Sequence, residues 1–163
     1  MRISFDLDDT LFVSPSDFEV EPEISFPWNK IYKEHLRYGT VDLIRQLQEE
    51  DVEVWIYTTS FRSQRYIRGL LKKYGIKIDE VVNGERHGRE VQRNKQEPMP
   101  SKYPSWYRID LHIDDDRSVM DNGRTYGFKV MLVGQQDDDW AKKIIEYVRE
   151  IKSKSVLHEQ MRN

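Results

Sequence analysis

The side chains of this chain that could do chemistry first appear at its start, where a short apolar run ends in two carboxylates. Residues 3–5 are followed by Asp6 and Asp8, with Thr10 two positions further on. Alternate residues of a strand share a face, so Asp6 and Asp8 would lie side by side if the strand continued. Two neighbouring carboxylates repel each other unless a cation or a proton lies between them. This arrangement suits a hard divalent metal ion and a carboxylate nucleophile.

Hydroxyl and ammonium groups that could bind a phosphate come later in the chain. The β-rich run 52–57 stops at Thr58 and Thr59. Hydroxyls between the end of a strand and the start of a helix are well placed to hold a phosphate oxygen. Thr58 is the preferred candidate and Thr59 the alternative, because the last residue of the strand cannot be located from sequence. Lys102 could neutralise the phosphate, with Lys95 as its rival.

A second acidic cluster closes the series. The apolar-leaning run 109–113 ends in Asp114, Asp115 and Asp116. A solvated acidic turn is the ordinary alternative, but three consecutive carboxylates after a strand are costly without a cation. We therefore expect Asp114 and Asp115 to complete a metal site. Asp116 is expected to cap the following helix.

Elements that could position these residues alternate between strand and helix along the chain. We predict strands near 2–6, 53–58, 79–82, 109–114 and 129–133, and helices near 41–50, 62–74, 117–125 and 138–152. This alternation predicts an α/β fold, a three-layer α/β/α, doubly wound (Rossmann-like) parallel sheet of about five strands. In such sheets ligands bind beyond the carboxyl ends of the strands. Asp6, Thr58 and Asp114 all fall at such ends.

Two segments, 12–39 and 83–108, fit no regular element and contain all six prolines. Apart from them, the chain reads as one domain over residues 1–153, followed by a polar tail at 154–163. A chain of this length can bury a core of its own. Among residues near the strand ends, several are expected to be solvated loop residues: Arg62, Asn83, Arg86 and His87. His112, inside a predicted strand, is expected to be a packed, hydrogen-bonded imidazole.

The order of the four groups resembles the four motifs of the haloacid dehalogenase (HAD) superfamily of phosphatases and phosphotransferases. The resemblance spans roughly residues 1–135. Cap domains in that superfamily are inserted at the positions of the two irregular segments. Both segments are too short here to fold a full cap with its own core. The chain therefore resembles the minimally capped, phosphatase-like members.

The resemblance implies a role for each group. Asp6 would be the nucleophile that forms an aspartyl-phosphate, and Asp8 the general acid and base. Thr58 or Thr59 would bind the phosphate together with Lys102. Mg²⁺ would be the cofactor, and the implied ligands are Asp6, the backbone carbonyl of Asp8, Asp114 and Asp115. Asp9 is expected to be a turn residue, and Thr10 to bond the local backbone.

The leading hypothesis is a Mg²⁺-dependent phosphohydrolase. Two alternatives stay open: phosphotransfer to an acceptor other than water, and a non-catalytic HAD-like protein that binds metal and partners. A receiver-type signalling module is disfavoured by the order of the acidic groups. A receiver has its acidic pair on the first strand and its acceptor aspartate on the third, whereas in this chain the acidic triplet 114–116 comes late. Hard oxygen ligands accept both Mg²⁺ and Mn²⁺, so the residues do not choose between them.

Composition narrows the setting of this chemistry. The chain has no cysteine, which excludes disulfides and thiolate catalysis. No apolar run approaches membrane-spanning length and no signal peptide is apparent, so we expect a cytoplasmic protein without a membrane partner. The net charge of −3 gives no reason to expect a nucleic-acid partner. The phosphorylated substrate could be small or macromolecular, and a homo-oligomer could close the open site.

Overall fold

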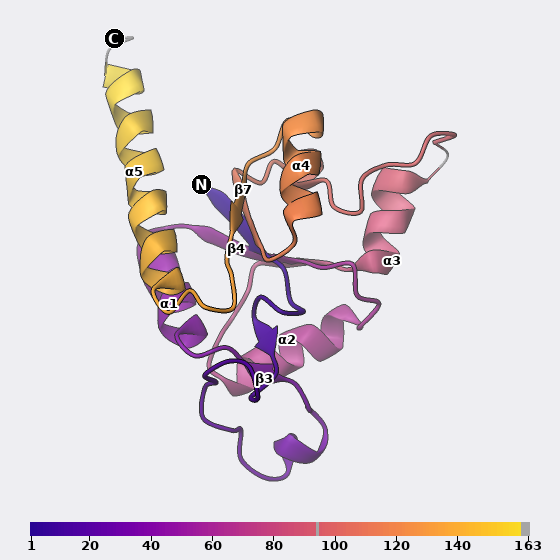
Figure 1. Ribbon diagram of the computed structural model, residues 1–163, viewed down its shortest axis with the longest axis vertical. Helices are drawn as coiled ribbons and strands as arrows, with labels where there is room; N and C mark the ends of the chain where they lie inside the picture. Colours follow the sequence, from indigo (N-terminus) through magenta and orange to yellow (C-terminus); the bar gives the residue numbers. More distant parts are fainter. Residues whose placement is uncertain (94, 161–163) are drawn as a thin grey trace.

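A five-stranded parallel sheet forms the centre of the molecule, as expected for the predicted α/β fold (Figure 1). The computed structural model describes residues 1–93 and 95–160, without the side chains of 156–160. The strand order is β5-β4-β1-β6-β7. The strands are β1 (Arg2–Phe5), β4 (Glu53–Tyr57), β5 (Glu80–Val82), β6 (Leu111–Asp114) and β7 (Val130–Leu132). The direction of strand addition reverses beside β1, which is where such sheets bind ligands.

The central strand β1 pairs with both β4 and β6, and the register brings their carboxyl ends level. Phe5 lies opposite Ile56 of β4 and Ile113 of β6. The backbone N–H of Asp6 still donates to the carbonyl of Ile113, at 2.9 Å. Asp6 and the last residue of β6, Asp114, therefore emerge side by side from adjacent strands.

Helices cover both faces of the sheet, which gives the three layers. One face carries α1 (Thr40–Glu49), α2 (Gln64–Lys73) and α5 (Trp140–Gln160), whose apolar residues share the main core with β1, β4 and β6. The other face carries α4 (Arg117–Tyr126) and the segment after β5. In Figure 1, α1 and α5 lie on the opposite side of the sheet from α3 and α4.

Two of the helix boundaries follow from local chemistry and one differs from the prediction. Asp116 caps α4 by accepting the N–H of Ser118 at 2.7 Å, as expected, and Gly127 ends the helix with a φ of 73°. The last helix, α5, continues to Gln160 instead of ending near residue 152. Its sequence has no proline or glycine between these positions that would stop it. Among the described helices, none is long and apolar enough to span a membrane.

The two irregular segments contain more regular structure than predicted. Residues 12–39 form the antiparallel pair β2 (Phe12–Val13) and β3 (His35–Leu36) with a 3₁₀ turn, η1 (Trp28–Lys30). Residues 83–108 form α3 (Gly84–His87), the π-helical η2 (Gly88–Gln92) and the 3₁₀ turn η3 (Pro104–Tyr107). Isolated turns this short carry little periodicity in the sequence, which explains why they were missed.

Both segments pack against the main domain. Tyr32 of the first segment lies over Gly69 of α2. A Cβ added to Gly69 would come within 2.1 Å of the hydroxyl oxygen of Tyr32. Val91 and Tyr107 of the second segment share an apolar cluster with Trp55 and Tyr57 of β4. Each segment is thus fixed to the sheet domain by buried contacts.

Candidate active site

A tight hydrogen-bonded turn over residues 7–12 follows β1, with Asp6 before it and Asp8 within it. The N–H groups of Leu11 and Phe12 both donate to the carbonyl of Leu7, at 2.9 and 2.7 Å. Asp9 adopts a φ of 59° within this turn, in the left-handed region that aspartate tolerates better than most residues, so its prediction as a turn residue is confirmed. Asp6 is left buried at the strand end, with 7% of its surface exposed. The side chain of Asp8 is exposed.

Lys102 bridges the first and last motifs. Its Nζ lies 2.8 Å from Oδ1 of Asp6 and 2.6 Å from Oδ2 of Asp114, and all three residues are buried. Burial raises the pKa of Asp6 to about 6 despite the nearby ammonium. Burial also disfavours the charged form of Lys102, but the two carboxylates keep its pKa above the ordinary value. The site therefore holds a buried cation between two acidic groups.

Asp114 receives further hydrogen bonds from its own strand and from the following turn. Nε2 of His112 lies 2.8 Å from Oδ2 of Asp114, and the Ser4 hydroxyl lies 2.8 Å from Nδ1 of His112. The N–H of Asp116 donates to Oδ1 at 2.9 Å. Burial lowers the pKa of His112, so it is neutral, accepts from Ser4 and donates to Asp114. Although burial opposes ionisation of Asp114, His112 and Lys102 lower its pKa to about 2.

Three of the predicted metal ligands converge. Carboxylate oxygens of Asp6, Asp114 and Asp115 lie within 4.8 Å of one another. Asp115 accepts a hydrogen bond from the Thr10 hydroxyl at 3.2 Å. This hydroxyl was expected to bond the local backbone, and it bonds the carboxylate instead. An all-oxygen set of anionic donors fits a hard divalent cation such as Mg²⁺. Burial raises the pKa of Asp115, as does the charge of Asp114, a repulsion that a cation would relieve.

The carboxylate of Asp8 lies apart from this triad and pairs with Arg62. Nη1 of Arg62 lies 3.0 Å from Oδ2 of Asp8, and Nε lies 2.9 Å from Oε1 of Glu34 in the first inserted segment. Tyr66 of α2 donates to the other oxygen of Glu34 at 2.6 Å. Arg62 was expected to be a solvated loop residue, and this was wrong. It ties the loop after β1 to the inserted segment.

The two hydroxyls after β4 occupy different positions. Thr58 is buried, and its Oγ1 accepts the N–H of Ser60 at 3.1 Å, which leaves its own O–H free to donate. Thr59 is exposed and lines the cavity over the aspartates. Both threonines follow β4 at the carboxyl edge of the sheet, but of the two it is Thr59, the alternative candidate, that lines the cavity with Asp6 and Asp8.

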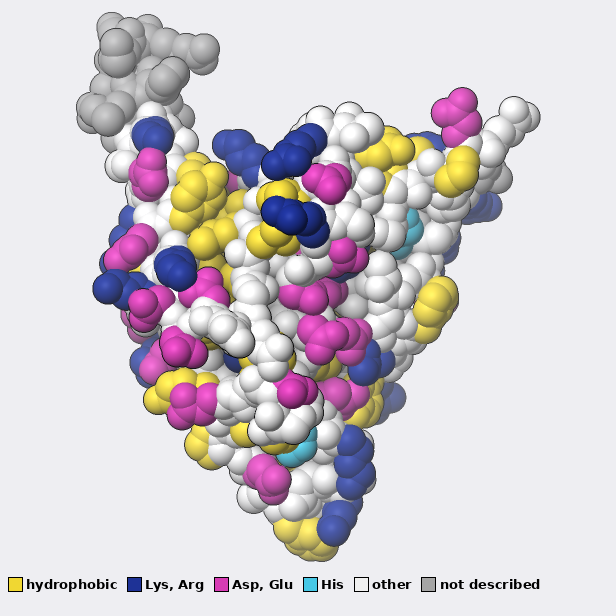
Figure 2. Space-filling model, viewed as in Figure 1, with side chains coloured by type: hydrophobic (Ala, Val, Ile, Leu, Met, Phe, Trp, Pro, Cys, Tyr) yellow, Lys and Arg dark blue, Asp and Glu magenta, His cyan; other side chains and the backbone are white. Residues whose placement is uncertain are grey.

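A cavity of about 460 Å³ opens above the aspartates. Figure 2 shows acidic side chains gathered on the face seen there, in the region between α4 and the first inserted segment. The cavity unites residues from all four predicted motifs, and its lining comprises Asp6, Asp8, Asp9, Thr59, Ser101, Lys102, Asp114, Asp115, Asp116, Arg117 and Val119.

Hydrogen bonds outside the cavity fix the loop that carries Lys102. The N–H of Tyr103 donates to the phenol oxygen of Tyr57 at 2.8 Å, and this oxygen lies 2.6 Å from Nδ1 of His87. His87 thus supports the site from outside the cavity. Lys95, the rival of Lys102, instead lies 3.5 Å from the Met99 sulfur.

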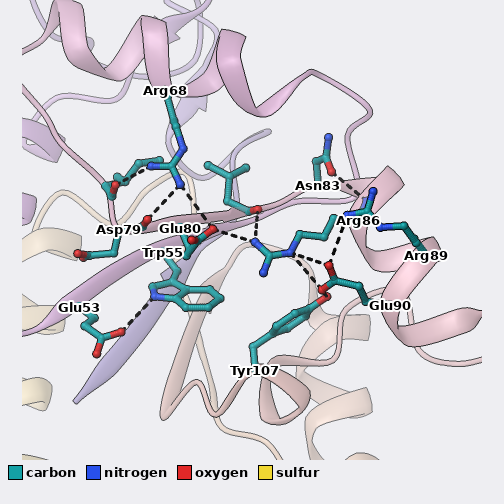
Figure 3. A network of polar contacts seen from close by, with 12 residues as sticks. Glu53, Trp55, Arg68, Asp79, Glu80, Asn83, Arg86, Arg89, Glu90 and Tyr107 are labelled. Carbon is teal, nitrogen blue, oxygen red and sulfur yellow. Dashed lines mark hydrogen bonds and ion pairs between the residues drawn. The ribbon is translucent and has the colours of Figure 1, made fainter.

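Arg86 was also expected to be a solvated loop residue, and it is instead the centre of an ionic network at the sheet edge (Figure 3). Nη1 of Arg86 lies 2.8 Å from Oε2 of Glu80, and Nε lies 3.1 Å from Oε2 of Glu90. Tyr107 donates to Glu90 at 3.0 Å. Asn83 is buried and caps α3 by accepting the N–H of Arg86. This network joins the second inserted segment to β5 and does not line the cavity described above.

One sequence signal could have found the partner of Asp114. His112 and Asp114 stand two apart in one strand and so share a face. By contrast, residues 8, 34 and 62 are brought together by loop geometry, which leaves no periodicity in the sequence to identify the contact.

Comparison with known proteins supports the fold. The chain matches no protein-family model and no curated protein sequence. Its structure is similar to that of D,D-heptose 1.7-bisphosphate phosphatase from B. bronchiseptica, solved in complex with magnesium and phosphate. The TM-score is 0.52 and the sequence identity 17%, with 86% of each chain covered. A likeness at this identity concerns the fold alone, and it supports the expected α/β fold with a parallel sheet.

Proposed function

We propose that this protein is a HAD-type, Mg²⁺-dependent phosphohydrolase that forms an aspartyl-phosphate on Asp6. The observation that carries the proposal is the Lys102 ammonium, which bridges Asp6 and Asp114 within 2.8 Å at the ends of adjacent strands. A carboxylate can attack an anionic phosphate only where positive charge screens the approach. The ammonium supplies part of that screening. Mg²⁺, held by Asp6, Asp114, Asp115 and the carbonyl of Asp8, would supply the rest when bound.

In the first step, a carboxylate oxygen of Asp6 bonds to phosphorus and the ester P–O bond breaks. The leaving oxygen takes a proton from the carboxyl group of Asp8, which acts as general acid. Lys102 neutralises charge on the phosphoryl oxygens, and the hydroxyl of Thr58, or that of Thr59 in the cavity wall, donates to one of them. Arg62 holds the side chain of Asp8 at the mouth of the site.

In the second step, a water molecule attacks phosphorus and the bond from phosphorus to Asp6 breaks. The carboxylate of Asp8 accepts the proton that the water loses, which restores the acid for the next turnover. The products are the alcohol and inorganic phosphate. Asp6 returns to its ionised form beside Lys102.

Hydrolysis of para-nitrophenyl phosphate tests this proposal. We expect turnover that requires Mg²⁺ and disappears in Asp6→Asn. Asp121→Asn is the matched control, because Asp121 is an exposed residue of α4 that pairs with Arg124. Metal-independent turnover, or undiminished turnover in Asp6→Asn, would contradict the proposal. Measurable Mg²⁺ binding without turnover of any phosphomonoester would favour the non-catalytic alternative.

A further inference from the structure

The charges around the cavity divide into an inner group and a rim. The inner group contains three carboxylates, of Asp6, Asp114 and Asp115, against the one ammonium of Lys102. One divalent cation would cancel this difference. With that cation the inner group would be neutral overall, so apart from the direct contacts of the cation and of Lys102 with the reacting phosphate it has no positive charge for a second one.

The exposed residues at the rim of the cavity also carry more negative than positive charge. Asp9 and Asp116 line the cavity, against one guanidinium, that of Arg117. Asp8 also lines it but is left out of this count, because it is protonated in its proposed role as general acid. Asp9, Asp116 and Arg117 are all exposed. Asp116 is the immediate neighbour of Arg117 and occupies the cap position of α4. The rim therefore offers no surplus of positive charge to a second anionic group of a substrate.

The other guanidinium near the mouth is already engaged. Arg62 donates to Asp8 and to Glu34, and also to the Ser60 hydroxyl at 2.8 Å. Its single charge is shared between two carboxylates. Arg62 therefore has no surplus positive charge to offer a phosphate or carboxylate on the substrate.

Coulomb interactions matter within a cavity of about 460 Å³. Two like charges about 4 Å apart in water repel by about 1 kcal/mol, and physiological salt largely screens charges more than about 8 Å apart. A substrate group next to the reacting phosphate therefore feels the rim. An anionic group there is repelled, and an ammonium group is attracted.

We infer that the substrate of this site is a phosphomonoester with one phosphate, whose remaining part is neutral or positively charged, such as an amino alcohol phosphate. The inference rests on the proposed function and makes it more specific. The inferred substrate differs from a bisphosphate, which is the type of substrate in the name of the structurally similar enzyme.

Three small phosphomonoesters of similar size test the inference: phosphoethanolamine, glycerol 2-phosphate and 2-phosphoglycolate. We expect kcat/KM of the parent to be lowest for 2-phosphoglycolate, with its additional carboxylate. In Asp9→Asn, the ratio of kcat/KM for 2-phosphoglycolate over phosphoethanolamine should rise about two- to fivefold, since one rim charge is removed. Asparagine also tolerates the left-handed backbone at this position. Intrinsic reactivities cancel, because the same ratio is compared between two proteins.

One further variant completes the test. Asp121→Asn, away from the cavity, should leave the ratio unchanged. A preference of the parent for 2-phosphoglycolate, or an unchanged ratio in Asp9→Asn, would overturn the inference. Turnover of para-nitrophenyl phosphate would still uphold the proposed function in those cases, whereas its absence for every ester would overturn both.

Discussion

The Nζ of Lys102 lies 2.8 Å from a carboxylate oxygen of Asp6, although the two residues belong to loops far apart in the chain. Both are buried, with 3% and 7% of their surfaces exposed. Burying an ammonium and a carboxylate is costly unless each is paired. The pair therefore has a structural consequence as well as a proposed chemical one, and the two can be measured separately.

Lys102→Met should destabilise the protein and abolish its activity. Removing one partner of a buried ion pair leaves uncompensated charge, so we expect the free energy of unfolding to fall by about 3–5 kcal/mol at neutral pH. Urea denaturation without Mg²⁺ measures this loss. Lys95→Met is the matched control and should change the free energy by less than about 0.5 kcal/mol. Equal effects of the two substitutions would contradict the role given to Lys102.

His112 should control Mg²⁺ affinity through Asp114. His112→Phe removes the donor to Oδ2 of Asp114 and leaves the Ser4 hydroxyl without its partner. Loss of a group that orients a metal ligand typically weakens binding about 10- to 100-fold. His112→Gln places an amide N–H near the position of Nε2 and should recover most of the affinity. Calorimetric titration with Mg²⁺ checks both variants. Equal Mg²⁺ affinities of His112→Phe and His112→Gln would show that the hydrogen-bond donor is unimportant.

The pKa of Asp6 predicts an unusual pH dependence of stability in the metal-free protein. It is raised from 3.8 to about 6 in the folded state, so between these pH values the folded protein keeps a proton that the unfolded chain has lost. The contribution of Asp6 should therefore lower the free energy of unfolding by about 3 kcal/mol as the pH rises through this window, whereas His112, whose pKa burial lowers, contributes in the opposite sense. Asp114, with its pKa lowered to about 2, acts in the opposite sense but only below this window.

Urea denaturation at several pH values from 4 to 7 measures this effect. Mg²⁺ binds the ionised carboxylate, so saturating Mg²⁺ should reduce the fall in stability. Asp6→Asn removes the titrating group, so the difference in stability between the parent and this variant isolates the contribution of Asp6. This difference should change by about 3 kcal/mol across the window, and a difference that stays constant from pH 4 to 6 would be inconsistent with the buried position of Asp6.

Gly69 should be required because Tyr32 packs against it. Alanine is favoured over glycine in a helix by about 1 kcal/mol, but a Cβ at this position would lie 2.1 Å from the Tyr32 hydroxyl. We expect Gly69→Ala to destabilise the protein by about 1–3 kcal/mol. In a Tyr32→Phe background the nearest atom is the ring carbon 3.1 Å away, still a close contact, and the same substitution should cost clearly less. A double-mutant cycle by urea denaturation tests this, and additive effects would disprove the contact.

Much of the fold could be predicted because strand ends in a parallel sheet converge. Asp6 and Asp114 were expected at such ends, and the register of β1 and β6 brings them together. The capping role of Asp116 depends on its immediate neighbours alone, and it too was predicted correctly. Predictions of this kind succeed because the relevant geometry is set by one or two adjacent elements.

Contacts set by the path of loops could not be predicted. Arg62 reaches Asp8 and Glu34 because the first inserted segment docks on α2, and no periodicity in the sequence encodes that docking. Thr10 bonds Asp115 across the site, a contact between residues of different loops. The continuation of α5 beyond residue 152 was missed because its polar end has a weaker apolar pattern than its start.

Formation of the phosphoenzyme tests the central claim most directly. Asp8→Asn should slow hydrolysis of the aspartyl-phosphate, so that rapid quenching after mixing with labelled para-nitrophenyl phosphate and Mg²⁺ traps a covalent phosphoryl group. We predict an acyl phosphate, labile to hydroxylamine, on Asp6, and none when Asp6→Asn is added to this variant. A label on another residue, or Mg²⁺-dependent turnover by the parent that persists in Asp6→Asn, would contradict the account.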